Sequence, residues 1–93
     1  MAVKQTIAYL GGLRCEAVHE PSKAKLLTDA PTDNMGKGES FSPTDLTATS
    51  LATCILTTMA IAARKYGAEL GPGSAEIEKH MTTNAPRRIA KLV

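Results

Sequence analysis

The sequence predicts an α+β fold, with antiparallel strands at the N-terminal end, one long central helix and further strands after it. Three observations support this prediction. Residues 3–28 alternate loosely between apolar and polar positions, divided by turn residues, and residues 43–66 place helix start and stop signals around an uncharged interior. Residues 75–93 return to the alternation of strands. A chain of 93 residues has room for one domain.

The first third of the chain predicts a three-stranded antiparallel meander. Gly11-Gly12 suits a two-residue turn, because glycine adopts positive φ at little cost, and Glu20–Lys23 is a second turn. The strands that these turns join are Val3–Leu10, Leu13–His19 and Ala24–Thr28.

Residues 29–40 are rich in Pro, Gly, Asp and Asn and predict a loop. Gly36-Lys37-Gly38 lacks the spacing of a Walker phosphate loop, and no strand leads directly into it. We therefore expect a surface loop here rather than a phosphate site.

The residues that follow this loop carry the clearest local signal in the chain. Ser42 is a helix cap, Pro43 stands at the first helical position, and Asp45 lies three residues after the cap. Gly67 is a natural left-handed stop. We predict a helix from Pro43 to about Tyr66.

The interior of this helix is unusual, since Leu46–Ala63 contains no charged residue. A helix without a charged stripe is expected to be buried nearly all round. A 93-residue chain buries too little surface to surround it, so we expect a partner subunit to supply the remaining walls. Several Ser and Thr residues in the segment argue against a membrane span.

After Gly71–Gly73 breaks the chain, the pattern predicts strands over Ala75–Thr82 and Arg87–Val93, joined by a turn at Asn84–Pro86. The strand pattern runs to Val93. We therefore expect a single domain over residues 1–93 that is incomplete at its C-terminal end.

The composition excludes several classes of function. Eleven Lys and Arg against nine Asp and Glu give a net charge of +2, which provides no electrostatic basis for binding nucleic acid or an anionic membrane. Two Tyr, one Phe and no Trp make stacking on bases unexpected. Residues 1–10 contain no secretory signal, and we predict a cytoplasmic protein.

The cysteines and histidines are too far apart for a metal clamp. Cys15, Cys54, His19 and His80 form no paired C-x-x-C or H-x-x-x-H spacing, so we expect no metal site. Two cysteines without a secretory context suit reduced thiols.

Cys54 lies near the middle of the predicted helix. At 100° per residue, the opposite face is largely aliphatic (Ala52, Leu56, Met59 and Ala63), and the face of Cys54 carries a row of hydroxyls together with two apolar residues and one lysine: Thr47, Ser50, Leu51, Thr57, Thr58, Ile61 and Lys65. One interpretation is a reactive thiolate steadied by hydroxyl donors. The other is an inert thiol among residues whose hydroxyls bond back to their own helix.

A reactive cysteine needs a cation close by, because the thiolate is the nucleophile. The helix start is too distant from Cys54 to serve, since the dipole acts within the first turn. Arg14, Arg87 and Arg88 are the candidates, because a buried arginine keeps its charge. The alternative for each is a solvated arginine on a strand.

Four segments closely resemble the OsmC/Ohr family, in particular its broad OsmC-like redox protein branch. They are Gly36–Leu46, Ala52–Cys54, Thr57–Met59 and Pro86–Ile89, and the likeness extends over essentially the whole chain. The resemblance implies an OsmC-like α+β fold and an intertwined homodimer with active sites at the subunit interface.

The resemblance also implies a thiol-dependent peroxidase that reduces organic hydroperoxides and, less well, hydrogen peroxide, without a cofactor. The family's peroxidatic cysteine lies on the central helix and matches Cys54. Its thiolate attacks the peroxide O–O bond and gives sulfenic acid and an alcohol; a second cysteine then forms a disulfide, which a dithiol reductant clears.

The chain departs from the family pattern in three places. The family's second cysteine belongs to a Cys-Pro-Val motif on a later helix, beyond the position of Val93, and Cys15 does not correspond to it. The organic-hydroperoxide branch has Glu where this chain has Thr44, with the acid one place later at Asp45. That branch's active-site arginine directly follows a Gly-Gly pair, whereas here Leu13 intervenes.

We therefore predict Cys54 as the nucleophile, Arg14 as the cation that stabilises its thiolate, and Asp45 as a helix-capping acid that could also hold Arg14. Two alternatives remain open. The chain could form a non-catalytic OsmC-like dimer that binds an apolar small molecule at the subunit interface, or it could be a domain remnant whose role is interaction.

Overall fold

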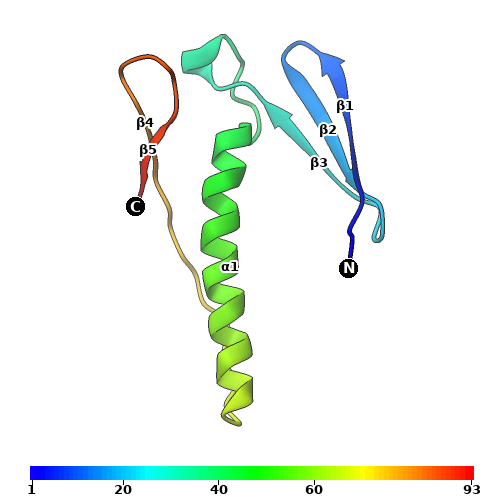
Figure 1. Ribbon diagram of the computed structural model, residues 1–93, viewed down its shortest axis with the longest axis vertical. Helices are drawn as coiled ribbons and strands as arrows, with labels where there is room; N and C mark the ends of the chain where they lie inside the picture. Colours follow the sequence, from blue (N-terminus) through cyan, green and yellow to red (C-terminus); the bar gives the residue numbers. More distant parts are fainter. The chain divides into compact units, whose positions relative to one another are not determined.

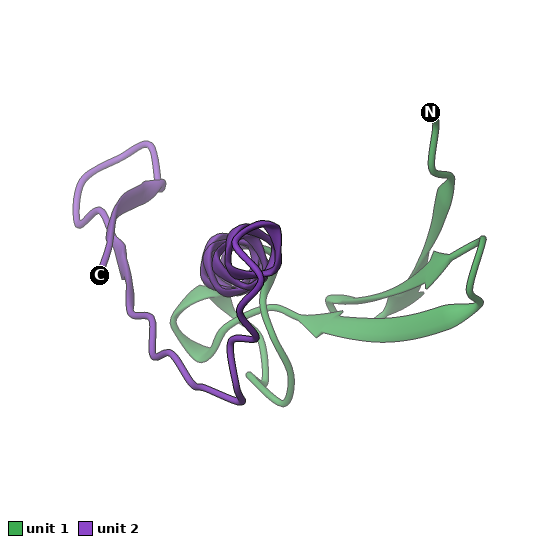
Figure 2. Cartoon of the chain, turned by 90° about the horizontal axis from the view of Figure 1, so that it is seen from below, with its two compact units in different colours: residues 1–43 green, residues 44–93 purple.

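The computed structural model describes all 93 residues and has the predicted α+β composition (Figure 1). The chain divides into two compact units, which Figure 2 colours separately. Unit 1 comprises residues 1–43, and unit 2 comprises residues 44–93.

Unit 1 contains the predicted antiparallel meander. Its strands are β1 (Gln5–Gly11), β2 (Arg14–His19) and β3 (Ala24–Asp29), paired in the order β1-β2-β3. The strand bounds agree with the sequence prediction to within two residues at each end.

The β1–β2 turn lies one residue later than predicted. An irregularity between Tyr9 and Gly11 shifts the pairing, so Gly12 and Leu13 form the turn and Gly11 pairs with Arg14. Leu13 has a φ of 63°, which is uncommon for a residue with a side chain. As a result Arg14, and not Leu13, is the first residue of β2.

The loop that closes unit 1 contains one short element that the sequence did not predict, the 3₁₀-helix η1 (Thr32–Asn34). The loop packs closely against the end of β3: a Cβ atom at Gly36 would collide with the backbone of Ala30. A backbone hydrogen bond of 3.0 Å from Asp29 to Phe41 brings the end of the loop back to the sheet.

Unit 2 begins with α1 (Pro43–Lys65), which confirms the predicted helix. Gly67 ends it with a φ of 74°. The amide of Gly67 donates to Arg64 at 3.1 Å and the amide of Ala68 donates to Ala63 at 3.0 Å, which is the Schellman pattern.

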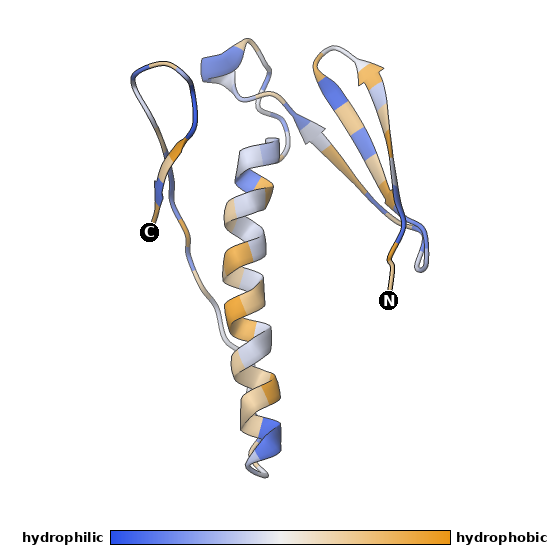
Figure 3. Cartoon of the chain, viewed as in Figure 1, coloured by the Kyte–Doolittle hydropathy of each residue, from blue (hydrophilic) through white to orange (hydrophobic).

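As expected for a chain of this length, the single chain does not enclose α1, and burial of the helix against a partner subunit stays a prediction. Ala48 is its buried residue, and Ile55, Met59 and Ile61 are each about half exposed. Figure 3 shows orange and pale bands along the interior of this helix, with blue near its two ends. The physical reason is that residues 44–93 contribute too little surface to cover a helix of 23 residues on every side.

The exposure of α1 follows the predicted division into two faces only in part. Ala52, Leu56 and Ala63, on the side opposite Cys54, are partly covered, and Ser50, Thr57 and Thr58 around the cysteine are exposed. Met59, however, lies on the opposite side and is 52% exposed. By length and composition α1 could also cross a membrane, a test that core helices of soluble proteins pass as well.

The remaining strands, β4 (Lys79–Met81) and β5 (Ile89–Leu92), form a two-stranded antiparallel sheet and are shorter than predicted. The register explains why. Glu78 exchanges backbone hydrogen bonds with Val93, so the residues before Glu78 find no partner on this strand.

Candidate functional site

Cys54 presents an accessible thiol in the middle of α1. Its side chain is exposed, and its sulfur lies 3.9 Å from the hydroxyl oxygen of Thr58, one helical turn further along. The face of α1 that carries this thiol has no covering layer in unit 2, and its enclosure by a partner subunit stays a prediction.

Two hydroxyls close to Cys54, those of Ser50 and Thr53, bond to carbonyls of their own helix. Ser50 donates to the Thr47 carbonyl at 2.7 Å, and Thr53 donates to the Thr49 carbonyl at 2.9 Å. This is the back-bonding that Ser and Thr commonly show inside helices. Thr58 is thus the hydroxyl that the structure places beside the sulfur.

Arg14 lies in unit 1 between two carboxylates. Its Nη2 donates to Asp29 Oδ2 at 3.3 Å and to Glu39 Oε2 at 2.6 Å. Asp29 is the last residue of β3 and pairs directly with Arg14 in the β2–β3 register, whereas Glu39 comes from the loop after η1. We refer to Arg14, Asp29 and Glu39 as the Arg14 cluster.

Asp29 is the most enclosed member of the Arg14 cluster, with 1% of its surface exposed. Its Oδ2 also accepts the backbone N–H of Glu39 at 3.0 Å, and its Oδ1 is buried without a hydrogen-bond partner. The Glu39 amide, together with the Arg14 guanidinium, holds the pKa of Asp29 below its usual value, although burial opposes this shift.

The two carboxylates act on Arg14 in return. Their hydrogen bonds, first that to Glu39 and then that to Asp29, raise the pKa of the Arg14 guanidinium above its usual value. Arg14 is therefore a permanent cation in this cluster.

Asp45 has a different partner from the one considered in the sequence analysis. Its Oδ1 lies 2.8 Å from the ammonium of Lys79 on β4, and the same ammonium donates to Thr44 Oγ1 at 2.8 Å. Lys79 is largely buried, with 13% of its side chain exposed. Asp45 thus links the start of α1 to β4, and the carboxylates that hold Arg14 are Asp29 and Glu39.

Of the two carboxylates that bind Arg14, the sequence pattern indicates Asp29 but not Glu39. The predicted turn at Glu20–Lys23 places Arg14 and Asp29 at equal distances on either side, so the antiparallel register alone puts them opposite each other. No pattern pointed to Glu39, because the path of a loop is not encoded by periodicity.

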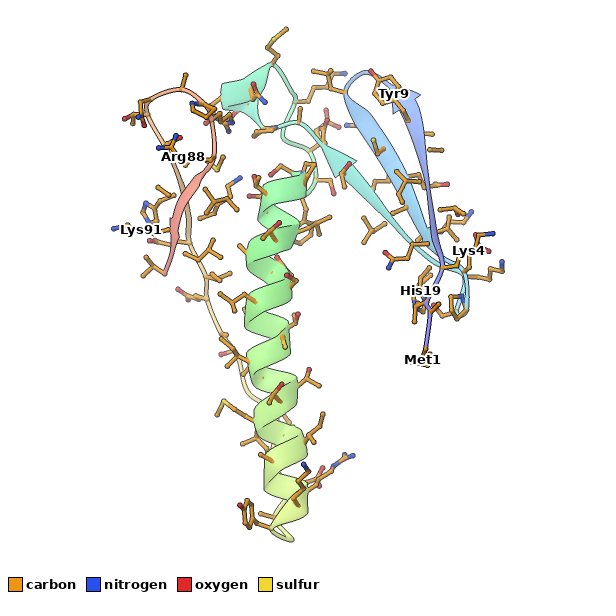
Figure 4. All side chains as sticks on the ribbon, in the orientation of Figure 1. Met1, Lys4, Tyr9, His19, Arg88 and Lys91 are labelled. Carbon is orange, nitrogen blue, oxygen red and sulfur yellow. The ribbon has the colours of Figure 1, made fainter.

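Three further side chains, those of Arg88, Tyr9 and Cys15, lie outside the Arg14 cluster. Arg88 donates to the Pro86 carbonyl at 2.7 Å within the β4–β5 connection, and Figure 4 labels it there. At the other end of the chain, the hydroxyl of Tyr9, also labelled, accepts the Leu13 amide at 3.3 Å beside the turn that precedes Arg14. Cys15 is a half-buried free thiol on β2.

Two open grooves lie beside α1 within unit 2. One has a volume of about 280 Å³ and is lined by Leu51, Ile55 and Leu92 among others. The second, of about 600 Å³, is bounded by Met59 and Leu70. Both have mainly apolar walls. Across the chain, no group of three or more His, Cys, Asp or Glu side chains has the arrangement of a metal site.

Comparison with known proteins adds one solved structure. No protein-family model matches the chain, and no curated protein matches it either. The chain is similar to a protein of known crystal structure from Psychrobacter arcticus 273-4. That protein is described as an osmotic stress induced and detoxification response protein. The two are 46% identical, with a TM-score of 0.88, over 95% of this chain and 64% of the other.

The chain thus spans somewhat less than two thirds of the length of that protein. Over this span both the sequence and the course of the backbone agree. The resemblance that the motifs around Cys54 indicated is therefore confirmed: over its 93 residues the chain is similar to an OsmC-like protein in sequence and in fold.

Proposed function

We propose that this chain is a subunit of a thiol-dependent peroxidase that reduces organic hydroperoxides, with Cys54 as the nucleophile. The observation that supports this most strongly is the exposed Cys54 thiol in the uncharged interior of the long helix of an OsmC-like fold. An exposed thiol can be reached by a substrate, whereas an enclosed structural cysteine is inert.

The proposed reaction begins with the Cys54 thiolate. Its sulfur attacks one oxygen of the hydroperoxide, an S–O bond forms as the O–O bond breaks, and the leaving alkoxide takes a proton to become an alcohol. Sulfur is oxidised to sulfenic acid and the peroxide is reduced. A dithiol reductant then attacks the sulfenic sulfur, releases water and restores Cys54 as it becomes a disulfide itself.

Arg14 is the cation proposed to stabilise the thiolate. Its permanent charge and planar set of donors suit an anionic partner, and Asp29 already fixes its position in unit 1. Asp45, by contrast, is proposed to act on the helix itself, through its capping position and Lys79.

The enzyme is proposed to work as a cytoplasmic homodimer. The support for a dimer is the apolar surface of α1, where Leu51, Ile55, Met59 and Ile61 are about half exposed. Contiguous apolar surface of this kind marks a protein interface more often than a solvated face.

Treatment with cumene hydroperoxide tests the catalytic proposal. The intact mass of the protein should increase by one oxygen atom on Cys54, and dimedone should trap the product as a sulfenic acid adduct. Cys54→Ser should abolish this oxidation and Cys15→Ser should retain it. A wild-type Cys54 that stays reduced while free glutathione is oxidised in the same tube would refute the catalytic role.

A second function is favoured by the two apolar grooves beside α1. In this alternative the chain is a non-catalytic dimer that binds an apolar small molecule. Native mass spectrometry would then find a co-purified apolar ligand on a protein whose Cys54 is inert to peroxide.

A further inference from the structure

The two carboxylates of the Arg14 cluster differ sharply in their exposure. The side chain of Asp29 is fully enclosed, whereas that of Glu39 is 58% exposed. Arg14 itself is about one third exposed, so one side of its guanidinium faces solvent. The same ion-pair chemistry therefore occurs in two different environments.

Asp29 is fixed from two directions. Arg14 approaches it across the β2–β3 pairing, and the backbone N–H of Glu39 donates to the same Oδ2 at 3.0 Å. An enclosed carboxylate that lost these donors would keep its charge without compensation, which is strongly unfavourable. Asp29 therefore stays in place as long as the loop and the sheet are folded.

Glu39 is held differently. Its backbone is fixed by Asp29, but its carboxylate extends to an exposed ion pair with Arg14 at 2.6 Å. Exposed ion pairs contribute little net stability, because water and salt replace the partner readily. The carboxylate of Glu39 can thus leave Arg14 without disturbing the Asp29 contact.

The charge of the cluster makes this difference important for the proposed reaction. Two carboxylates against one guanidinium leave the cluster net negative, and such a cluster repels a thiolate. When Glu39 leaves, the pair of Arg14 and Asp29 is neutral, and Arg14 presents free N–H donors to another anion.

We propose that Asp29 is the positioning residue that holds Arg14, and that the carboxylate of Glu39 is an internal competitor that an anionic partner of Arg14 must displace. This inference rests on the proposed function in one respect, namely that the displacing anion is the Cys54 thiolate. The proposal that Asp29 binds Arg14 more firmly than Glu39 does is independent of that function.

The first test measures Arg14 directly, in the absence of peroxide. In the ¹⁵N-labelled chain, the Nη2–H resonance of Arg14, assigned by its loss in Arg14→Lys, should be protected from solvent exchange. Asp29→Asn should increase its exchange rate at least tenfold, and Glu39→Gln should change it less than twofold. Glu16→Gln, which removes a carboxylate from the same strand, is the matched control and should have no effect.

The second test is the rate at which cumene hydroperoxide oxidises Cys54. Glu39→Gln should raise the second-order rate constant severalfold, whereas Asp29→Asn should lower it to the level of Arg14→Gln. A rate that falls in Glu39→Gln, or equal effects of Asp29→Asn and Glu39→Gln on Arg14 exchange, would overturn the proposal.

The two tests separate this inference from the proposed function. If wild-type Cys54 does not react with peroxide, the function fails while the exchange measurement still decides the roles of Asp29 and Glu39. If Asp29→Asn does not fold, Glu39→Gln alone is decisive, because loss of Arg14 protection in that variant contradicts the positioning role of Asp29.

Discussion

Arg14 owes its position to the register of the sheet. It is the first residue of β2 and faces Asp29, the last residue of β3, so each side chain meets its partner as soon as the two strands pair. The shift of the preceding turn by one residue places Arg14, and not Leu13, at this point. A local feature of the backbone thereby fixes the cation of the proposed site.

Replacing Arg14 should slow the chemistry of Cys54. In Arg14→Gln the planar shape is partly kept and the charge is lost, so oxidation of Cys54 by cumene hydroperoxide should slow about tenfold or more. Arg14→Lys keeps the charge without the planar set of donors and should lie between wild type and Arg14→Gln. Stopped-flow measurement of sulfenic acid formation checks the order; equal rates in all three proteins would contradict it.

Asp29 should make stability depend on pH in a defined range. Its pKa in the folded chain is below its usual value, so it contributes stability that is present above about pH 3.9, the ordinary Asp value, and is lost as the pH falls through the folded pKa. Urea unfolding of wild type and Asp29→Asn should therefore differ most at neutral pH and converge in acid. A difference that grows in acid would contradict the assigned direction.

At the scale of elements, the chain follows its local signals closely. Ser42, Pro43 and Gly67 mark the ends of α1 within a residue or two, because caps and stops act through neighbouring backbone groups. The lengths of β4 and β5 were less predictable, since a strand exists only where its partner runs alongside. Likewise the register of the predicted strands already implied the ion pair between Arg14 and Asp29. The ion pairs of Glu39 with Arg14 and of Lys79 with Asp45 depend on tertiary packing, which the sequence pattern does not describe.

Gly67 offers a test of how α1 ends. Its φ of 74° favours glycine, and a Cβ there would meet no other atom within 4 Å, so Gly67→Ala introduces backbone strain without a clash. We expect a loss of about 1 kcal/mol of unfolding free energy. Gly71→Ala is the control, because Gly71 also has open space around it and lacks a positive φ. Urea unfolding should find little change in that variant.

The link between α1 and β4 can be tested by a double-mutant cycle. Asp45→Ala and Lys79→Ala should each lower stability, and the coupling between them should be about 0.5–1 kcal/mol, since Lys79 is largely buried and Asp45 is partly exposed. Strictly additive effects in urea unfolding would mean that the pair contributes no energy of its own.

In the whole molecule, apolar surface is exposed on α1 and also on the strands of unit 1, where Ile7 and Tyr9 are each 65% exposed. The sequence predicted that this helix needs walls that the chain does not provide, and the half-exposed apolar side chains along it agree with that reasoning. What the sequence could not supply was the identity of the covering surface, because periodicity describes a face and not its partner.

A charge in the middle of this surface should disrupt the proposed dimer. Ile55 is 51% exposed on α1, so Ile55→Glu should fold as wild type does but weaken self-association at least tenfold. Lys37→Glu, an exposed change in the loop of unit 1, is the control. Sedimentation velocity over a range of concentrations distinguishes the variants; a wild-type protein that is monomeric at every concentration contradicts the proposed dimer.

Cys54 is proposed to be a reactive thiol and not merely an accessible one. This is tested by letting the two free cysteines of the chain compete for a limiting amount of cumene hydroperoxide, with dimedone present and peptide mass spectrometry as the readout. Nearly all of the adduct is expected on Cys54, and Arg14→Gln should remove this preference. Equal labelling of Cys54 and Cys15, or labelling of Cys15 first, would contradict this proposal.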